Sequence, residues 1–420
     1  MFNSKGIVIL LTAMLVPLAG RPAEPQPPHP APPSGFIAQP SASHALHPDQ
    51  PYVTPEMYGA VGNDISTDDT EAIQRLFSEK HGKLILFPGK DYHISETITI
   101  PKRIGCHVMG AGFHSGGKIR RGHGLMGNLS RLVWIGSSDA PMVVYHGSGL
   151  IWNGVELCGR PPEQETAKKA KIGFLVAKSG KGIGTGKMWF PALSINNCET
   201  GFQAGTHERM HNCDNLIFGY LALSNCTYGF RTRNHMAMDI HFSFVKAGGT
   251  MDTLFYFERG GAMHVNGLGL HSANIGTMLR IGWVGRNNGF FSLNNVKIDA
   301  VARNLKLIDM EQPCPAVITV TNLKRSWNDP RPTDFSRAYT LKGPAVLAIR
   351  DSRHIVGAQC FVTSPDAEGN VPNVLLDHCD LPAELDSEDL HHPDSSGKWY
   401  FKTRDCYAET GPNGWHRPLD

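Results

Sequence analysis

The chain of 420 residues is 41% apolar and carries a formal net charge of +2, so it can bury a large core. A net charge this small does not favour binding to nucleic acid, and no nucleic-acid partner is expected. With 45 glycines, 29 prolines and a charged fraction of 19%, the composition is typical of short strands joined by many turns. Any partner must therefore be recognised by a local patch.

The first 51 residues do not predict a packed structure. Lys5 precedes the apolar run Ile7 to Ala19, which has the length of a signal-peptide core and is too short to span a membrane. Ten prolines between Pro22 and Pro51 indicate a spacer. We expect a signal peptide (1–20), a proline-rich spacer (21–51) and a folded domain (52–420). The protein is then secreted, periplasmic or on the cell surface, with no integral membrane segment after signal removal.

A capping helix is predicted from about Asp68 to Lys80. Thr67, or Ser66 before it, is a suitable N-cap, and Asp68 and Asp69 place negative charge at the positive end of the helix dipole. Apolar residues then recur at helical spacing: Ala72, Ile73, Leu76 and Phe77. Such a helix must lay its apolar face on another element, and both aspartates are expected to be structural.

The segment YGAVGNDISTDDTEAIQ (58–74) and the later FPGKDY (87–92) carry a family resemblance. They resemble the N-terminal signature of the pectate lyase superfamily, in the branch with rhamnogalacturonase-like and epimerase-like proteins, although Asn63 and Asp64 replace the usual Asp-Gly. The resemblance implies an all-β fold: a right-handed, single-stranded parallel β-helix with a short N-terminal capping helix. It does not specify a reaction.

An internal repeat supports the same fold. A small or polar residue followed by a large apolar one recurs with steps of 28, 28, 24, 24 and 27, at Gly173-Phe174, Gly201-Phe202, Gly229-Phe230, Thr253-Leu254, Thr277-Met278 and Asn304-Leu305. A repeat of this length cannot bury its apolar face alone, so repeats must stack. Short strands with Asn and Gly corners match one coil of a parallel β-helix per repeat.

Stacked coils place equivalent positions in columns, since adjacent strands lie about 4.8 Å apart. The large residues of the repeat are expected in one inward column: Phe174, Phe202, Phe230, Leu254, Met278 and Leu305. Asn197 and Asn225, with Asn274 as a further candidate, are expected in a corner ladder of hydrogen-bonded amides. The nine cysteines lack zinc spacing and are expected as buried, stacked thiols, although export leaves disulfides open.

Three outward columns are expected beside this core. Their members are Gln203, Arg231, Phe255, Leu279 and Lys306; then Gly205, Arg233 and Phe257; then His207, His235 and Arg259. The result is a cationic strip with Glu208 and Glu258 adjacent, which suits a uronate-containing polysaccharide because guanidinium binds carboxylate bidentately. The alternative is a solvated face of internal ion pairs. Arg280 falls in the inward column, so either a strand slips there or the alignment is one residue off.

A second polar group comes from MDIHFSF (238–244) and MHVNGLGL (263–270), which place Asp239, His241, His264 and Asn266 on matching coils. An aspartate and a histidine within reach can act as acid and base. The alternative is a pair of exposed, hydrogen-bonded surface residues.

The motifs of known β-helix enzymes are incomplete. Gly122-His123-Gly124 lacks the other members of the polygalacturonase series, and Val133-Trp134-Ile135 lacks the Asp-His that follows in pectate lyases. No DPHD-type epimerase motif occurs, and the loop GKGIGTG (180–186) lacks P-loop spacing. No metal site or cofactor is predicted, and Ca²⁺ is left open with no site identified.

We expect an exported carbohydrate-active protein, a polysaccharide lyase or glycoside hydrolase, whose partner is a polysaccharide that includes uronates. Elimination would use Arg233 or His235 as the base and a guanidinium to neutralise the uronate carboxylate. Hydrolysis would instead need two carboxylates, and Asp252 is a further candidate for one of them. The candidate catalytic residues are Arg233, His235, Glu258, Asp239 and His241, and the substrate-binding candidates are His207, Arg231 and Arg259. The rival hypothesis is a non-catalytic, glycan-binding or surface-displayed β-helix.

Overall fold

The structure, a computed structural model, describes residues 50–418 except 80–81, 103–104, 113–128, 162–163, 165–166, 178–184, 207–212, 285–288, 300–304, 326–335, 354–358, 383–386 and 411–414. The predicted signal peptide and nearly all of the spacer lie outside these residues, as does His207. The described residues belong to one compact unit, Ala45–Asp420.

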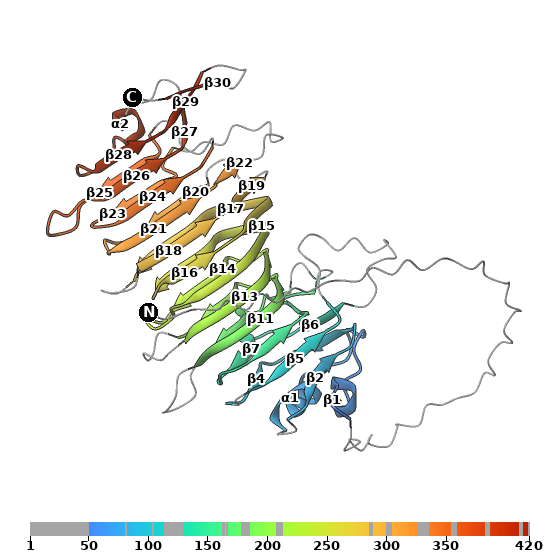
Figure 1. Ribbon diagram of the computed structural model, residues 1–420. Helices are drawn as coiled ribbons and strands as arrows, with labels where there is room; N and C mark the ends of the chain where they lie inside the picture. Colours follow the sequence, from blue (N-terminus) through green and yellow to red (C-terminus); the bar gives the residue numbers. More distant parts are fainter. Residues whose placement is uncertain are drawn as a thin grey trace, which may run out of the picture. The chain divides into compact units, whose positions relative to one another are not determined.

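The N-terminal cap consists of a 3-10 turn, η1 (Pro55–Tyr58), and the helix α1 (Thr70–Ser78), at the blue end of Figure 1. The helix begins after Asp69, so the predicted N-cap at Thr67 or Ser66 was wrong. Ser66 and Thr67 instead close a turn on Asp64, to which both donate hydrogen bonds of 2.7 Å through their hydroxyls. These residues therefore serve the turn that precedes the helix.

Both aspartates of the cap bind backbone amides. Asp69 is buried and accepts hydrogen bonds from the N–H groups of Val61 at 2.7 Å and His93 at 3.2 Å. Asp68 accepts one from Thr70 N at 3.0 Å. The apolar face of α1 is buried, and Phe77 packs against Phe87 with ring centroids 6.3 Å apart. The cap thus covers the first coil, and the aspartates are structural.

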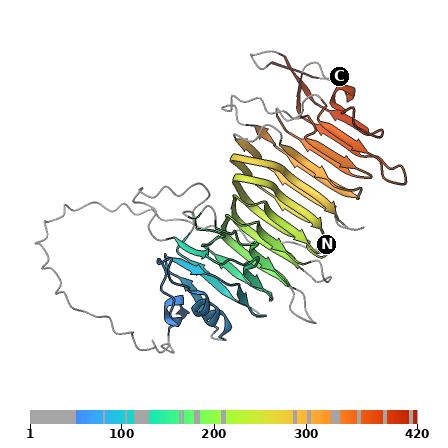
Figure 2. The ribbon, with the colours of Figure 1, turned by 180° about the vertical axis from the view of Figure 1, so that it is seen from behind.

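The remaining strands wind into coils with three sheet faces, and the coils lie side by side in Figure 1 and from behind in Figure 2. Face A contains β1 (Tyr52–Val53), β2 (Leu84–Phe87), β5 (His107–Gly110), β8 (Ile151–Asn153), β16 (Ala262–Val265), β18 (Gly289–Asn294), β21 (Ala316–Thr321), β24 (Val346–Arg350), β26 (Asn373–Asp377) and β28 (Tyr400–Arg404). Face B contains β3 (Asp91–Ile94), β6 (Ser130–Trp134), β9 (Val155–Cys158), β19 (Val296–Asp299) and β22 (Lys324–Arg325). Face C contains β4 (Ile98–Ile100), β7 (Pro141–Tyr145), β10 (Ile172–Val176), β12 (Thr200–Ala204), β14 (Tyr228–Arg233), β20 (Lys306–Met310), β23 (Tyr339–Lys342) and β25 (Phe361–Ser364).

Four long strands continue around the corners between faces: β11 (Thr185–Asn196), β13 (Cys213–Ser224), β15 (Ile240–Arg259) and β17 (Leu268–Trp283). All pairings within the 27-stranded sheet are parallel. Near the C-terminus, α2 (Ser387–Leu390) accompanies a small sheet of β27 (Asp380–Pro382), β29 (Tyr407–Thr410) and β30 (Trp415–Pro418). The fold is a right-handed parallel β-helix, as predicted. No helix among the described residues is long and apolar enough to cross a bilayer.

The core column follows the prediction for three coils and then departs from it. Phe174, Phe202 and Phe230 are in register and fully buried. Phe230 then pairs with Phe255, 25 residues later, and the column continues through Leu279. The predicted column was therefore off by one residue at Leu254 and Met278 and by three at Leu305, since Leu279 pairs with Ile308.

This correction changes which side chains face outward. Leu254, Met278 and Leu305 are buried as expected, but Phe255 and Leu279, expected outside, are core residues, and Gln203 is buried as well. Lys306 pairs with Thr277 rather than with Leu279. Arg280 faces outward beside Tyr256, because strand residues alternate in and out.

The amide ladder lies at a different corner from the predicted one. Asn197 and Asn225 do adopt left-handed backbone at a corner, with φ of 56° and 54°, but Asn225 Oδ1 accepts a hydrogen bond from Thr250 N at 3.2 Å. Asn274 lies within β17, where it pairs with Thr250 rather than with Asn225. An amide-to-amide bond between successive coils joins Asn322 Nδ2 to Asn295 Oδ1 at 2.7 Å. All nine cysteines are buried and none is disulfide-bonded.

Candidate functional site

An irregularity in β15 shapes the outer surface of face C. Thr232 pairs with Phe257, but the next residue, Arg233, pairs with Arg259, so Glu258 is the extra residue of a β-bulge. Thr232 Oγ1 anchors the bulge by donating a 2.7 Å hydrogen bond to the carbonyl oxygen of Arg259. Bulges re-aim side chains, and this one places Glu258 and Arg259 together on the outer surface.

Two arginines of the predicted strip pair with one carboxylate. Arg231 Nε donates to Glu258 Oε2 at 2.9 Å, and its Nη2 contacts the same oxygen. Arg233 Nε lies 3.2 Å from that oxygen. The guanidinium of Arg231 also contacts two rings, 4.9 Å from the centroid of Tyr228 and 5.3 Å from that of Tyr256. For these two arginines, the internal ion-pair alternative is correct.

Arg259 has different surroundings. Its Nη1 lies 3.4 Å from His235 Nε2, and among the described residues no carboxylate forms an ion pair with its guanidinium. Since guanidinium can only donate, His235 Nε2 is the acceptor in this contact. The ring of His235 meets Trp283 edge-on with centroids 4.4 Å apart, and Trp283 is 38% exposed.

The turn that carries His235 is held by its neighbours. Asn234 is buried, and its Oδ1 accepts a 2.8 Å hydrogen bond from Met236 N. Gly260 follows Arg259 with φ of 89°, and a Cβ there would lie 2.4 Å from the carbonyl oxygen of Asn234. Only glycine suits this close approach. These contacts therefore fix the backbone at the end of face C, where His235 and Arg259 meet.

These residues open onto a cleft of about 420 Å³. It is lined by His235, Glu258, Arg259, Gly282, Trp283, Glu311 and Gln312. Gly282 lies between the two glutamates, since a Cβ added to it would be 2.8 Å from the carbonyl oxygen of Glu258 and 3.1 Å from Glu311 Oε2. A side chain at this position would collide with the Glu258 backbone, so glycine allows the two coils to approach here.

Glu311 is held by a tyrosine. Tyr256 Oη donates to both carboxylate oxygens of Glu311, at 3.2 and 3.1 Å. Burial, with the charge of Glu311 beside it, raises the pKa of Tyr256, so the phenol remains a donor over the physiological range. Arg280, 5.7 Å from the ring centroid of Tyr256, is itself paired with Asp252 at 3.1 Å.

The structure thus brings together five of the eight predicted site residues: Arg231, Arg233, His235, Glu258 and Arg259. His207 lies outside the described residues. Asp239 and His241 are not among the residues that line the cleft. Asp239 adopts left-handed backbone with φ of 53° just before β15, and His241 stacks on His264 on face A with centroids 5.0 Å apart. Asp252 forms an ion pair with Arg280 and is not among the residues that line the cleft.

Sequence reasoning missed Tyr256, Gly282, Trp283, Glu311 and Gln312. The bulge at Glu258 and the register error hid them, because the predicted columns beyond Phe230 paired the wrong residues. The sequence did contain one sign of the error, since the predicted alignment placed the charged Arg280 in the inward column. An alignment in which Arg280 faces outward has the correct register and places Gly282 opposite Glu258.

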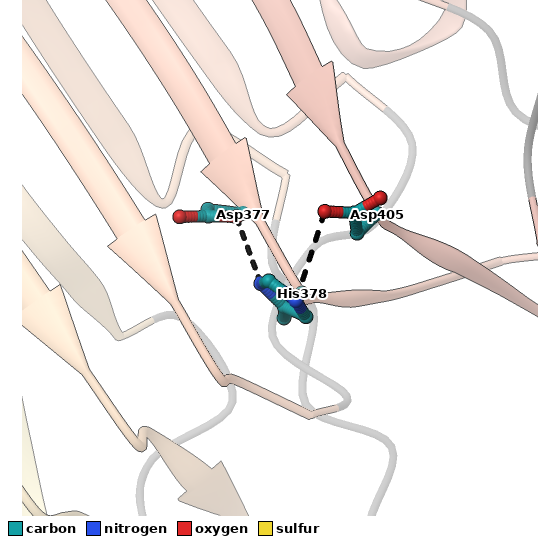
Figure 3. A group of neighbouring side chains, drawn as sticks. All are labelled: Asp377, His378 and Asp405. Carbon is teal, nitrogen blue, oxygen red and sulfur yellow. Dashed lines mark hydrogen bonds and ion pairs between the residues drawn. The ribbon is translucent and has the colours of Figure 1, made fainter.

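A second cluster, Asp377, His378 and Asp405, brings candidate ligand atoms within 4.8 Å of one another (Figure 3). His378 Nδ1 lies 2.8 Å from Asp377 Oδ1, and its Nε2 lies 3.7 Å from Asp405 Oδ2. However, the fork of Arg404 already binds both oxygens of Asp377. His378 and Asp405 have φ of 51° and 47°, so the cluster forms one corner of successive coils. Corner geometry explains it, and we assign no metal to it.

Searches against protein-family models and against curated proteins return no match. Solved structures with a similar fold include the enzymatically active domain of bacteriophage CBA120 tailspike protein 2, at 15% identity and a TM-score of 0.40, covering 86% of this chain and 47% of that one. An N-terminal fragment of bacteriophage Phi29 gene product 12 is 14% identical with a TM-score of 0.46, covering 84% and 66%. The A-module of the Azotobacter vinelandii mannuronan C-5 epimerase AlgE4 is 14% identical with a TM-score of 0.39, covering 84% and 94%.

The chain spans about half the length of the CBA120 domain and about two thirds of the Phi29 fragment. At these identities the similarity concerns the fold alone. The molecule belongs to the class of right-handed parallel β-helix proteins, the architecture implied by its resemblance to the pectate lyase superfamily. Its activity must be argued from the cleft.

Proposed function

We propose that the protein binds an acidic polysaccharide in the cleft beside Trp283 and cleaves it by β-elimination next to a uronate. One observation carries the proposal: Arg259 faces the cleft beside the imidazole of His235, whereas Arg231 and Arg233 both pair with Glu258. Arg259 is thus the guanidinium in place to receive a substrate carboxylate. Such a pairing is bidentate and charge-assisted.

The chemistry follows from this arrangement. When the uronate carboxylate takes the guanidinium of Arg259, His235 Nε2 loses its donor and becomes available as a base. Neutralising the carboxylate makes the C5 proton more acidic, and His235 takes that proton. The C5–H electrons form the C4=C5 double bond, the C4–O bond breaks, and the leaving oxygen takes a proton from water. Trp283 offers a half-exposed ring on which a sugar can pack.

We place this activity outside the cell, because the polymer is large and the sequence of residues 1–20 has a signal-peptide pattern. Face C is an open surface on a solenoid, so a long chain can lie across it without threading.

The proposal is tested by incubating the protein with polyuronates and neutral glycans. Two products are measured: the ultraviolet absorbance of an unsaturated uronate and the number of new reducing ends. Elimination gives both signals. His235→Gln and Arg259→Ala should each lower the rate about 100-fold or more, the usual contribution of a general base or a charge-stabilising group. Arg353→Ala, an exposed arginine on a different coil with a side chain 62% exposed, is the matched control and should be neutral.

Hydrolysis is the second candidate, and the two glutamates favour it. Glu258 and Glu311 line the same cleft from coils two apart, which corresponds to roughly 9 to 10 Å of backbone separation. An inverting glycosidase needs two carboxylates with room for a water between them. Reducing ends without ultraviolet absorbance would support hydrolysis. Binding with neither product would support the non-catalytic hypothesis.

A further inference from the structure

The cleft has a cationic end and an anionic end. Arg259 supplies the positive charge at one end, and Glu311, two coils further along, supplies the negative charge at the other. Glu258 lies between them, but two guanidinium groups compensate its charge. A bound chain therefore meets a positive and a negative charge at two different places in the cleft.

The charge of Glu311 is directed at the cleft and is not cancelled by a cation. Tyr256 binds the carboxylate through a neutral hydroxyl. Lys342 donates a 2.8 Å hydrogen bond to the backbone carbonyl of Glu311, and within the described chain no lysine or arginine forms an ion pair with its carboxylate. Tyr256 is in turn fixed between the guanidinium groups of Arg231 and Arg280. The carboxylate is thus held in position.

We propose that the cleft selects a glycan in which the uronate at Arg259 is followed by a sugar without a carboxylate, such as a hexose or an N-acetylhexosamine. This inference rests on the proposed function and specifies its substrate class. The carboxylate of Glu311 accepts a hydrogen bond from a hydroxyl or amide N–H of that second sugar. It repels a second carboxylate at the same place, and such a repulsive element is an effective source of specificity.

Two probes test this selectivity: a polygalacturonate as the homopolymer, and an alternating polymer of uronate and N-acetylhexosamine. Cleavage is measured as kcat/KM, and binding of short oligomers of both probes is measured by calorimetry. The wild type should prefer the alternating probe at least ten-fold. Glu311→Gln should reduce this preference by improving binding and cleavage of the homopolymer, because the repulsion is removed while a hydrogen-bonding group remains.

Two controls separate selectivity from folding. Tyr256→Phe removes only the hydroxyl that holds Glu311, and should reduce the preference without changing the melting temperature by more than a few degrees. Glu71→Gln makes the same charge change at a side chain on α1 that is 87% exposed, and should leave the preference unchanged.

The outcomes are distinguishable. Equal or better cleavage and binding of the homopolymer by the wild type would overturn the inference and leave the proposed function standing. An identical loss on both probes in Glu311→Gln would overturn it as well, since Glu311 would then act in catalysis or folding alone. Selective binding without cleavage would support the inference and reject the eliminative function. Binding of neither probe would reject both.

Discussion

At the scale of residues, the three arginines at this end of face C have distinct roles. Arg231 and Arg233 share the carboxylate of Glu258, and the side chains of Arg231 and Glu258 are each only 18% exposed. Arg259 contacts His235 and faces the cleft. One carboxylate, brought outward by a bulge, therefore determines which guanidinium is left for a ligand.

Glu258→Gln should leave the guanidinium groups of Arg231 and Arg233 without their shared counter-charge. We expect lower thermal stability, because Arg231 is largely buried and loses its counter-charge. We also expect stronger, less selective binding of any polyanion, with a steeper loss of affinity as salt rises. Melting curves and calorimetry against an acidic glycan at two ionic strengths check both effects. Unchanged polyanion binding would show that Arg231 and Arg233 remain inaccessible.

Asp377 predicts a pH dependence of stability. Hydrogen bonding from Arg404, together with His378, lowers the pKa of Asp377 to about 2. A depressed pKa means that this carboxylate stabilises the fold fully above its ordinary pKa of 3.8, and that the contribution is lost as the pH falls toward 2. Melting temperatures measured from pH 6 to pH 2 should therefore fall more steeply for the wild type than for Asp377→Asn. Parallel curves would remove Asp377 from the acid response.

At the scale of elements, the sequence predicted the type of structure better than its register. The capping motif and the repeat of 24 to 28 residues sufficed for a capped parallel β-helix, because each repeat must stack to bury its apolar residues. Phe174, Phe202 and Phe230 were placed correctly. The next coil was not, because leucine and phenylalanine are adjacent at 254–255 and both are buried. A hydrophobicity pattern alone cannot separate two neighbouring core residues.

Only part of the candidate site could be predicted, again because the register of the coils was not known. Arg231, Arg233, His235, Glu258 and Arg259 were recognised as one charged group, but the alternation rule cannot anticipate a bulge, which depends on tertiary anchoring by Thr232. Gly282, Trp283 and Glu311 follow that bulge on later coils. They could be found only once the register was known.

The core column gives a prediction for the elements. Phe230→Ala should destabilise the protein by about 3 to 5 kcal/mol, the usual cost of emptying a buried aromatic site. Phe230 is fully buried, and its ring stacks on Phe202 at 5.3 Å. The denaturant midpoint measures the loss. The matched control is Phe290→Ala on face A, whose side chain is 40% exposed and should cost much less. Equal costs would argue against the assigned faces.

At the scale of the whole molecule, a solenoid is stabilised by contacts between neighbouring coils. Residues 1–50 have no periodic apolar pattern in the sequence, so we expect a chain that begins at Pro51 to melt at the same temperature as the full-length mature protein. A drop of many degrees would show that this segment contributes to the folded unit and would contradict its assignment as a spacer.

In the proposed reaction, Arg259 receives a uronate carboxylate while His235 faces C5 of the same sugar. The most direct measurement is a crystal structure of the inactive His235→Gln variant with an oligosaccharide that contains uronate. We predict a carboxylate within hydrogen-bond distance of the Arg259 guanidinium, with a sugar ring packed on Trp283 and residue 235 directed at C5. An oligosaccharide bound on another face, or one whose carboxylate pairs with Arg231 or Arg233 in place of Glu258, would contradict the claim.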